Sequence, residues 1–150
     1  MSEENNDNQS PKNLINIITF NVRATKTIGD NGLIPWINIA NANEEILNLI
    51  DKDEIVISEN EITIVIDYPL TNPASLSLIS ETGFSREKLL IEIRTKYIEI
   101  FEEEEKAIAI NDGKGKYGIW GHSLYDLDLV SLDVYKTDLG KIEITLDIDS

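Results

Sequence analysis

The only histidine of the chain, His122, is the side chain best suited to proton transfer near neutral pH. Its imidazole can serve as a general base or a metal ligand, and two carboxylates, Asp126 and Asp128, follow it closely. One hypothesis is therefore a small hydrolase-like enzyme centred on His122 with Asp126 and Asp128. No nucleophile in a recognisable sequence context accompanies the histidine, so a turn or surface histidine is the competing interpretation.

The stretch around this histidine, residues 117–122, is the least generic part of the chain. Gly118 and Gly121 flank Trp120, which indicates close backbone packing or unusual backbone dihedral angles. We therefore expect any binding site in this region to include Trp120 and His122.

Three glycines, Gly113, Gly115 and Gly118, match a dinucleotide-binding pattern by letter. That pattern needs a strand before it and a helix after it. Here an acidic helical segment precedes the glycines and the residues after them are typical of strands, so we interpret this segment as a loop.

The end of the chain alternates apolar and polar residues in two segments, which predicts a final β-hairpin. The apolar parity changes between Leu129 and Leu132, and this change predicts a β-bulge at Val130-Ser131. Pairing Leu132 with Ile144 sets apolar residues opposite one another and gives the expected register.

That register brings together the candidate metal ligands, which are four aspartates: Asp126, Asp128, Asp147 and Asp149. It sets Asp128 opposite Asp147 and Asp126 opposite Asp149. Like charges opposite one another destabilise a sheet, so solvent, a lysine, a raised pKa or a cation must relieve them. Oxygen ligands suit calcium, so a calcium-responsive module is a further alternative, and calcium is the one cofactor we consider.

The net charge of −15 is the main compositional signal about partners, because 28 acidic residues face only 13 basic ones. Such a charge repels nucleic acid and anionic membranes and attracts basic proteins, although it can also serve solubility alone. Our first hypothesis is therefore a non-enzymatic acidic binding or regulatory domain that acts on a basic partner protein.

The strongest predicted element is a long helix over residues 85–106, with Ser85 as its N-cap. Apolar residues recur at helical spacing and form one stripe, which consists of Leu89, Leu90, Ile93, Tyr97, Ile100 and Phe101. Ile91 and Ile98 lie off this stripe, so a neighbouring segment such as the one around Trp36 covers them or a partner does. The acids at residues 102–105 must be solvated or the helix must continue beyond them.

Strand patterns surround this helix, and a shorter helix is expected near residues 43–51. Alternating isoleucines on both sides of Glu59-Asn60 also predict a β-hairpin. Because the strands do not alternate with helices, we expect an α+β fold, a mostly antiparallel sheet packed against the long helix.

Length and composition indicate how the chain can form a core and where the protein is located. The chain has 150 residues, no cysteine and 41% apolar residues, which permits a core without disulfides. We expect a polar tail over residues 1–12 and one domain over residues 13–150. The start lacks a secretory signal and no segment is apolar enough to span a membrane, so we expect a cytoplasmic protein.

Overall fold

The computed structural model describes residues 12–24, 32–111, 113, 115–119 and 122–150. The expected tail therefore lies almost entirely outside the described residues. The strands are β1 Lys12–Thr19, β2 Val22–Arg23, β3 Leu33–Ile34, β4 Ile37–Asn38, β5 Ile55–Ile57, β6 Glu61–Ile66, β7 Ala74–Ile79, β8 Phe84–Ser85, β9 Asp128–Thr137 and β10 Ile142–Asp149. The helices are α1 Ala42–Glu45, the 3-10 turn η2 Ile46–Asn48, α2 Arg86–Ile110 and the 3-10 turn η3 Leu124–Asp126.

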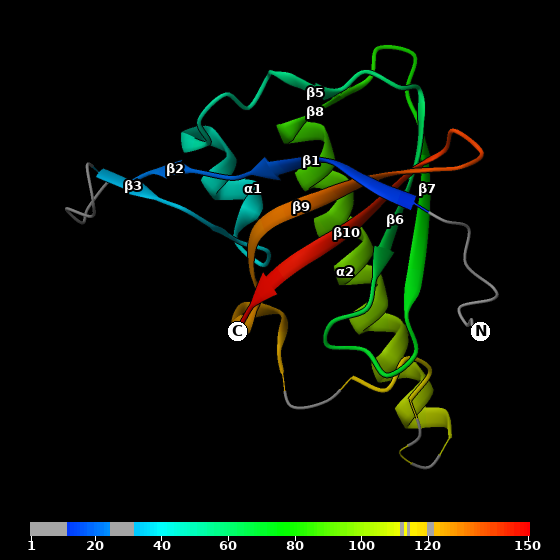
Figure 1. Ribbon diagram of the computed structural model, residues 1–150. Coiled ribbons are helices and arrows are strands. Elements are labelled where there is room, and N and C mark those ends of the chain that lie inside the picture. The colour runs from blue at the N-terminus through cyan, green and yellow to red at the C-terminus, as the bar shows by residue number, and fades with distance from the viewer. Residues whose placement is uncertain (1–11, 25–31, 112, 114, 120–121) are drawn as a thin grey trace, which may run out of the picture.

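The main sheet has the order β1-β9-β10-β6-β7, and β4 also pairs with β9. All pairings are antiparallel except that of β10 with β6, which is parallel. Helix α2 lies against one face of this sheet (Figure 1). The expected α+β class, with a mostly antiparallel sheet packed on one long helix, is confirmed.

One hydrophobic cluster forms the core between the sheet and α2. On the sheet side it takes alternate residues of neighbouring strands, as the period of two requires. These residues are all at most 3% exposed: Ile18, Ile62, Ile64, Ile66, Leu132, Val134, Ile142 and Ile144. The facing residues of α2 are fully buried: Leu89, Leu90, Ile93, Tyr97 and Ile100. The predicted stripe therefore faces the core.

Helix α2 begins where the sequence predicts, because the Ser85 hydroxyl accepts a hydrogen bond from the backbone N–H of Lys88 at 3.1 Å. It continues to Ile110, one turn beyond the expected end at residue 106. The four glutamates at residues 102–105 therefore lie inside the helix, and Glu104 is only 5% exposed.

The predicted bulge between β9 and β10 is confirmed, but the predicted register is wrong by two residues. Leu132 pairs with Leu146 and not with Ile144. The turn sets this register: Gly140 has a φ of +79°, and the Thr137 N–H donates to the Lys141 carbonyl at 2.9 Å. A tight turn with glycine at positive φ is a common hairpin connection. A shift of two keeps every side chain on its face, so the apolar pattern does not resolve it.

The predicted hairpin around Glu59-Asn60 is also wrong in its pairing. Strand β6 uses one edge for β7 and the other for β10, so neither edge is left for β5. Strand β5 pairs instead with β8, in a separate two-stranded sheet. The short helix is confirmed as α1 followed by η2, and it ends at Asn48 rather than at residue 51.

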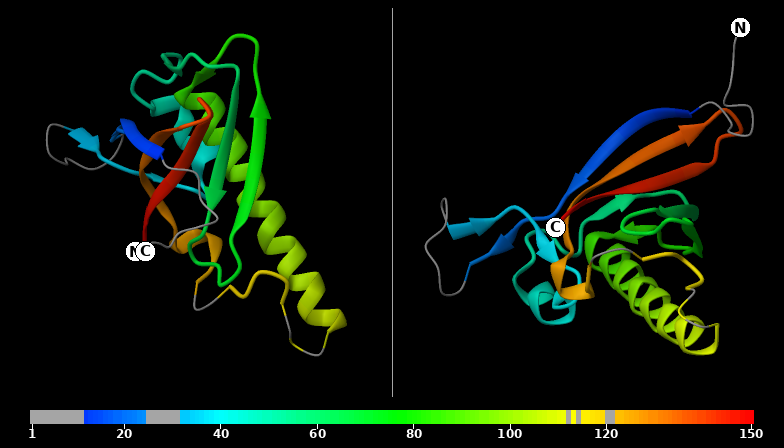
Figure 2. Two further views of the ribbon diagram at one scale, coloured as in Figure 1. Left: turned by 45° about the vertical axis from the view of Figure 1, so that its right-hand side comes forward. Right: turned by 90° about the horizontal axis from the view of Figure 1, so that it is seen from below.

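Strands β1, β9 and β10 run side by side and extend together beyond α2 (Figure 2). We call this part the β1–β9–β10 arm. Within the described part of the chain, no helix is long and apolar enough to cross a membrane.

Candidate functional site

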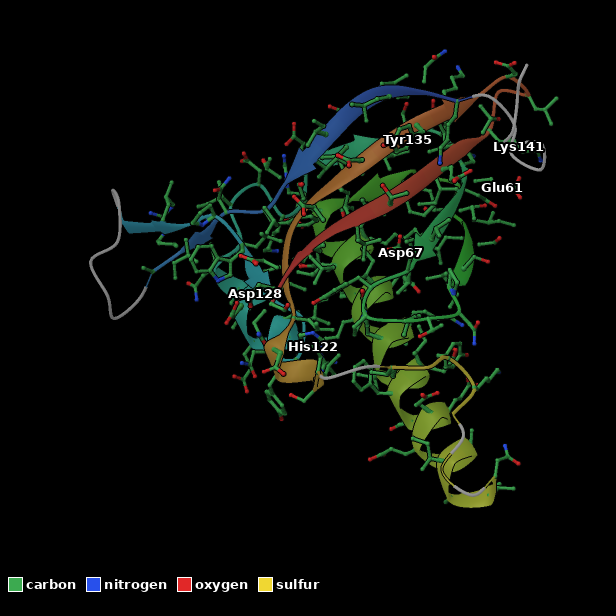
Figure 3. All side chains as sticks on the ribbon, turned by 60° about the horizontal axis from the view of Figure 1, so that its bottom comes forward. Glu61, Asp67, His122, Asp128, Tyr135 and Lys141 are labelled. Carbon is green, nitrogen blue, oxygen red and sulfur yellow. The ribbon has the colours of Figure 1, made fainter. Side chains whose placement is uncertain are left out.

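His122 lies beside η3 (Figure 3). It belongs to a small polar cluster with Tyr68, which follows the end of β6, and with Ser150. The Tyr68 hydroxyl is 3.0 Å from Nε2 of His122 and 2.6 Å from the Ser150 hydroxyl. The rings of Tyr68 and His122 lie 5.4 Å apart at an angle of 50°. The structure therefore gives the histidine a phenol as a hydrogen-bond partner, which sequence reasoning missed.

The backbone of Tyr68 is fixed from the core side by Tyr97 of α2. The Tyr97 hydroxyl donates to the Tyr68 carbonyl at 2.7 Å. Burial, with smaller contributions from Asp67 and Tyr68, raises the pKa of Tyr97 well above its ordinary value. Tyr97 therefore stays protonated and acts as an anchor for the segment after β6.

The two aspartates expected beside His122 each bind another group. Asp126 accepts from the backbone N–H of Ser123 at 3.0 Å in the capping box of η3. Asp128 accepts from the amide of Asn38 at 3.0 Å. Both carboxylates thus hold local structure, and the hydrolase-like arrangement stays a prediction. Trp120, the other residue expected here, lies outside the described residues.

The four candidate metal ligands are not brought together as predicted. Asp149 pairs with Asp128, and Asp147 pairs with Ser131, because the register differs by two residues. Asp126 belongs to η3 and not to a strand. Across the described ranges, no group of three or more acidic or histidine side chains is arranged to hold a metal ion.

Glu45, the last residue of α1, is a carboxylate whose pKa is shifted by its surroundings. Burial raises the pKa of Glu45, a hydrogen bond from the backbone of Asn38 lowers it, and the charges of Asp128 and Glu44 raise it further. The net shift is upward. The ionised form of Glu45 is therefore less favourable in the folded protein than in the unfolded chain.

Glu104 is the most completely bound carboxylate of the described chain, and sequence reasoning did not identify it. It accepts backbone hydrogen bonds from Tyr117 at 2.7 Å, Gly118 at 3.1 Å and Ile119 at 3.0 Å. Burial raises the pKa of Glu104, but the backbone hydrogen bonds more than compensate and hold its pKa below the ordinary value. Helical spacing carries the signal, because Glu104 follows Ile100 by four residues on the buried face.

This arrangement explains one glycine, Gly115, of the loop that precedes His122. A Cβ atom at Gly115 would lie 2.0 Å from the Glu104 carboxylate, so a side chain there would displace Glu104. The backbone donors of residues 117–119 are engaged by Glu104, so they are not available to a phosphate. Glu104 therefore holds the C-terminal part of α2 against residues 117–119.

The solvent-facing side of α2 is the second candidate site. We define the α2 outer face as Ile91, Thr95, Ile98, Glu102 and Glu105, which follow one another at spacings of three and four residues. Ile91 is 47% exposed and Ile98 is partly buried. Cover by the segment around Trp36 stays a prediction; Ile91 is at most partly covered, and Trp36 is itself 43% exposed.

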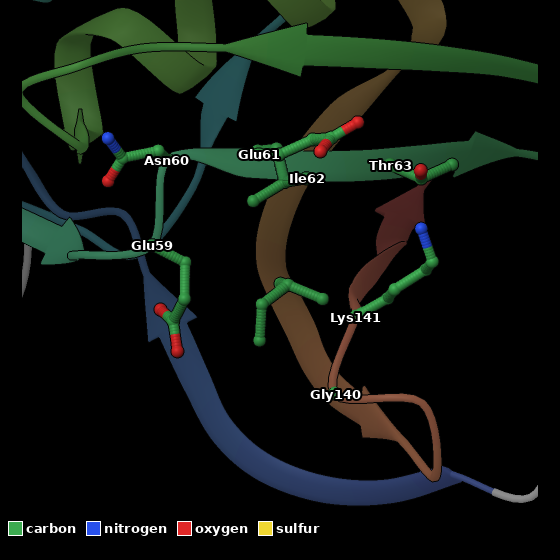
Figure 4. A pocket seen from close by; sticks show the side chains of 8 residues that line it. Glu59, Asn60, Glu61, Ile62, Thr63, Gly140 and Lys141 are labelled. Atoms are coloured by element: carbon green, nitrogen blue, oxygen red, sulfur yellow. The ribbon is translucent and has the colours of Figure 1, made fainter.

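An open hollow of about 300 Å³ lies at the starts of β6 and β10 (Figure 4). Glu59, Glu61 and Lys141 are among its lining residues. Lys141 points toward Thr63, whereas Glu59 lies on the other side of the hollow (Figure 4). The lining contains no histidine.

In the comparisons with known proteins, no family model, no curated protein and no solved structure matched the chain.

Proposed function

We propose that the chain is a non-enzymatic acidic binding domain, and that its α2 outer face binds a basic segment of a partner protein. The observation that carries the proposal is the exposure of Ile91, which is 47% accessible in the second turn of α2, although its neighbours Leu89, Leu90 and Ile93 are fully buried. Aliphatic side chains surrounded by charged residues are typical of protein-binding surfaces.

The spacing of this surface fits a helical or extended partner. Ile91 and Ile98 are seven residues apart, which corresponds to about 10 Å along a helix that rises 1.5 Å per residue. A partner helix with apolar residues at the same spacing can contact both isoleucines at once.

The charges of the same face define the chemistry of the partner. Glu102 and Glu105 are exposed, and Glu99 beside them is also exposed, although it forms an ion pair with Lys96 at 2.8 Å. Lys106 is the basic residue that accompanies them near the end of the helix. With a net charge of −15 over the whole chain, lysine and arginine on the partner increase the association rate and set the orientation.

A titration with a designed peptide tests the proposal. The probe is a synthetic amphipathic helix of leucine and lysine, and its matched control carries glutamate in place of lysine. We expect calorimetry to detect binding of the lysine peptide alone and to show weaker binding as salt rises, because salt screens exposed charges.

Substitutions locate the binding surface. The double variant Ile91→Ser with Ile98→Ser is expected to weaken binding at least about tenfold, which corresponds to about 1.4 kcal/mol. The matched control is Ile79→Ser, because Ile79 is 76% exposed but lies on β7. Unchanged binding by the double variant, or an equal loss in the control, would place the binding elsewhere and refute the proposal.

A further inference from the structure

The outer edge of β1 is the second exposed apolar surface, and it lies on the β1–β9–β10 arm rather than on α2. Strand β1 ends the main sheet, so only its inner edge pairs with a described strand. Leu14, Ile15 and Ile17 are 51%, 51% and 52% exposed. An apolar strand edge exposes backbone donors and acceptors beside apolar side chains and is a template for pairing with another strand.

The charge of this region differs from that of the whole chain. Strand β1 contains no acidic residue and has Lys12 as its one charged residue. Its partners in β9 add Asp133 and Lys136, so the paired segments carry 2 − 1 = +1. Lys12 is itself paired with Glu143 at 2.9 Å. Counting Glu143, the local charge is 2 − 2 = 0, so a basic partner finds no free carboxylate on this strand and a second copy of the chain meets no net local charge of its own sign.

We propose that this edge pairs with β1 of a second copy and forms a two-fold symmetric, antiparallel dimer. A two-fold axis near Asn16 sets Ile15 beside Ile17 of the second copy, so the same apolar pair forms twice. Each copy uses the β1 edge that pairs with no described strand, and the contact closes at two chains.

Two features of β1 keep this dimer weak and finite. The register of β1 against β9 shifts between Leu14 and Asn16, and such a bulge twists a strand edge and shortens the stretch that can pair. The Asn16 side chain also accepts from the Ile17 N–H at 2.8 Å, and a new strand must compete with this bond. A contact limited to one short strand falls below the roughly 1,200 Å² of a stable interface, so the dimer forms at high concentration.

Sedimentation equilibrium over a range of concentrations tests the dimer. We expect a reversible monomer–dimer equilibrium that strengthens as salt rises, because salt screens the repulsion between two chains of charge −15. The peptide binding proposed above has the opposite salt dependence, so failure of one proposal is distinguishable from failure of the other. A mass that is independent of concentration at every salt level would refute the dimer.

Matched variants locate the contact. Ile17→Lys is expected to weaken dimerisation at least about tenfold, because each substitution counts twice in a two-fold interface. Ile79→Lys on the opposite edge strand is the control and is expected to leave the equilibrium unchanged. Ile91→Ser with Ile98→Ser should also dimerise normally. An equal loss in either control would assign the contact to another surface.

The absence of cysteine from the sequence allows a direct geometric test. Asn16→Cys introduces the only thiol, and opposed antiparallel strands hold facing Cα atoms about 4.5–5.5 Å apart, within disulfide range. We expect mild oxidation to cross-link this variant and to leave Ser77→Cys on β7 monomeric. Cross-linking of the β7 variant alone would overturn the proposed pairing.

Discussion

Removing the Glu104 carboxylate tests whether the loop before His122 is fastened to α2 as the structure indicates. Glu104→Ala removes the acceptor of three backbone hydrogen bonds, those of 2.7, 3.1 and 3.0 Å to residues 117–119. Hydrogen bonds to a charged group contribute about 1.5–3 kcal/mol each. Each backbone donor left buried without an acceptor costs about 1–3 kcal/mol. Water can reach part of the freed loop, so we expect a loss of about 3–5 kcal/mol in the free energy of unfolding, towards the lower end of the sum for three donors.

Urea unfolding followed by circular dichroism measures this loss, and Glu105→Ala is the matched control. Glu105 is the next residue and is exposed, so its removal is expected to change stability by less than about 0.5 kcal/mol. Glu104→Gln keeps the shape of the side chain but directs an N–H₂ group at backbone donors, so it should recover only part of the loss. A Glu104→Ala variant as stable as the Glu105→Ala control would refute the fastening.

The same variant has a defined pH dependence. The pKa of Glu104 is lower in the folded protein than the ordinary value of 4.5. Its contribution to stability is therefore fully present above that ordinary value and is lost as the pH falls through the folded pKa. The difference between the wild type and Glu104→Ala should shrink below about pH 4.5. A difference that stays constant into strong acid would mean that the carboxylate charge contributes nothing.

The other expected outcomes concern the core, a strained carboxylate and calcium. Ile93→Ala is expected to cost about 2–5 kcal/mol of unfolding free energy because Ile93 is fully buried, whereas Ile91→Ala should cost less than about 0.5 kcal/mol; urea midpoints compare them. Equal costs would place the wrong side of α2 in the core. Glu45→Gln is expected to leave the free energy of unfolding at pH 7 equal or higher, because folding raises the pKa of Glu45 and so disfavours its ionised form. Any gain should vanish as the pH falls through the raised pKa of Glu45. A clear loss of stability at pH 7 would contradict the raised pKa. Millimolar calcium is expected to leave the thermal midpoint unchanged, because the described acidic side chains form no group of three around a common point; a rise that a chelator reverses would restore the calcium hypothesis.

Local patterns predicted the elements of the fold but not all of their partners. The helical stripe of α2, its Ser85 cap and the bulge in β9 all follow from short-range spacing, which a single sequence displays directly. The parallel pairing of β10 with β6 depends on contacts far apart in the chain, and nothing in the local pattern distinguishes it. The β9–β10 register failed because the apolar pattern is unchanged by a shift of two, while the turn at Gly140 decided the shift.

For the candidate sites too, local spacing was predictable from the sequence and contacts between distant segments were not. Ile91 was identified correctly as lying off the buried stripe, because helical spacing alone places it there. Tyr68 was missed because its contact with His122 joins two segments 54 residues apart in sequence. The sequence shows that Glu104 continues the spacing of the stripe. It does not show the backbone donors of residues 117–119 that bind the carboxylate.

Amide chemical shifts from nuclear magnetic resonance test the proposed function most directly, because they report which residues a bound peptide touches. During titration with the leucine–lysine helix, we expect the largest shifts at Ile91, Thr95 and Ile98 and at the glutamates that follow them on α2. Strand β1 should shift little at concentrations where the chain is monomeric. Shifts centred on β1 or on the outer side of the sheet, with α2 unchanged, would contradict the account.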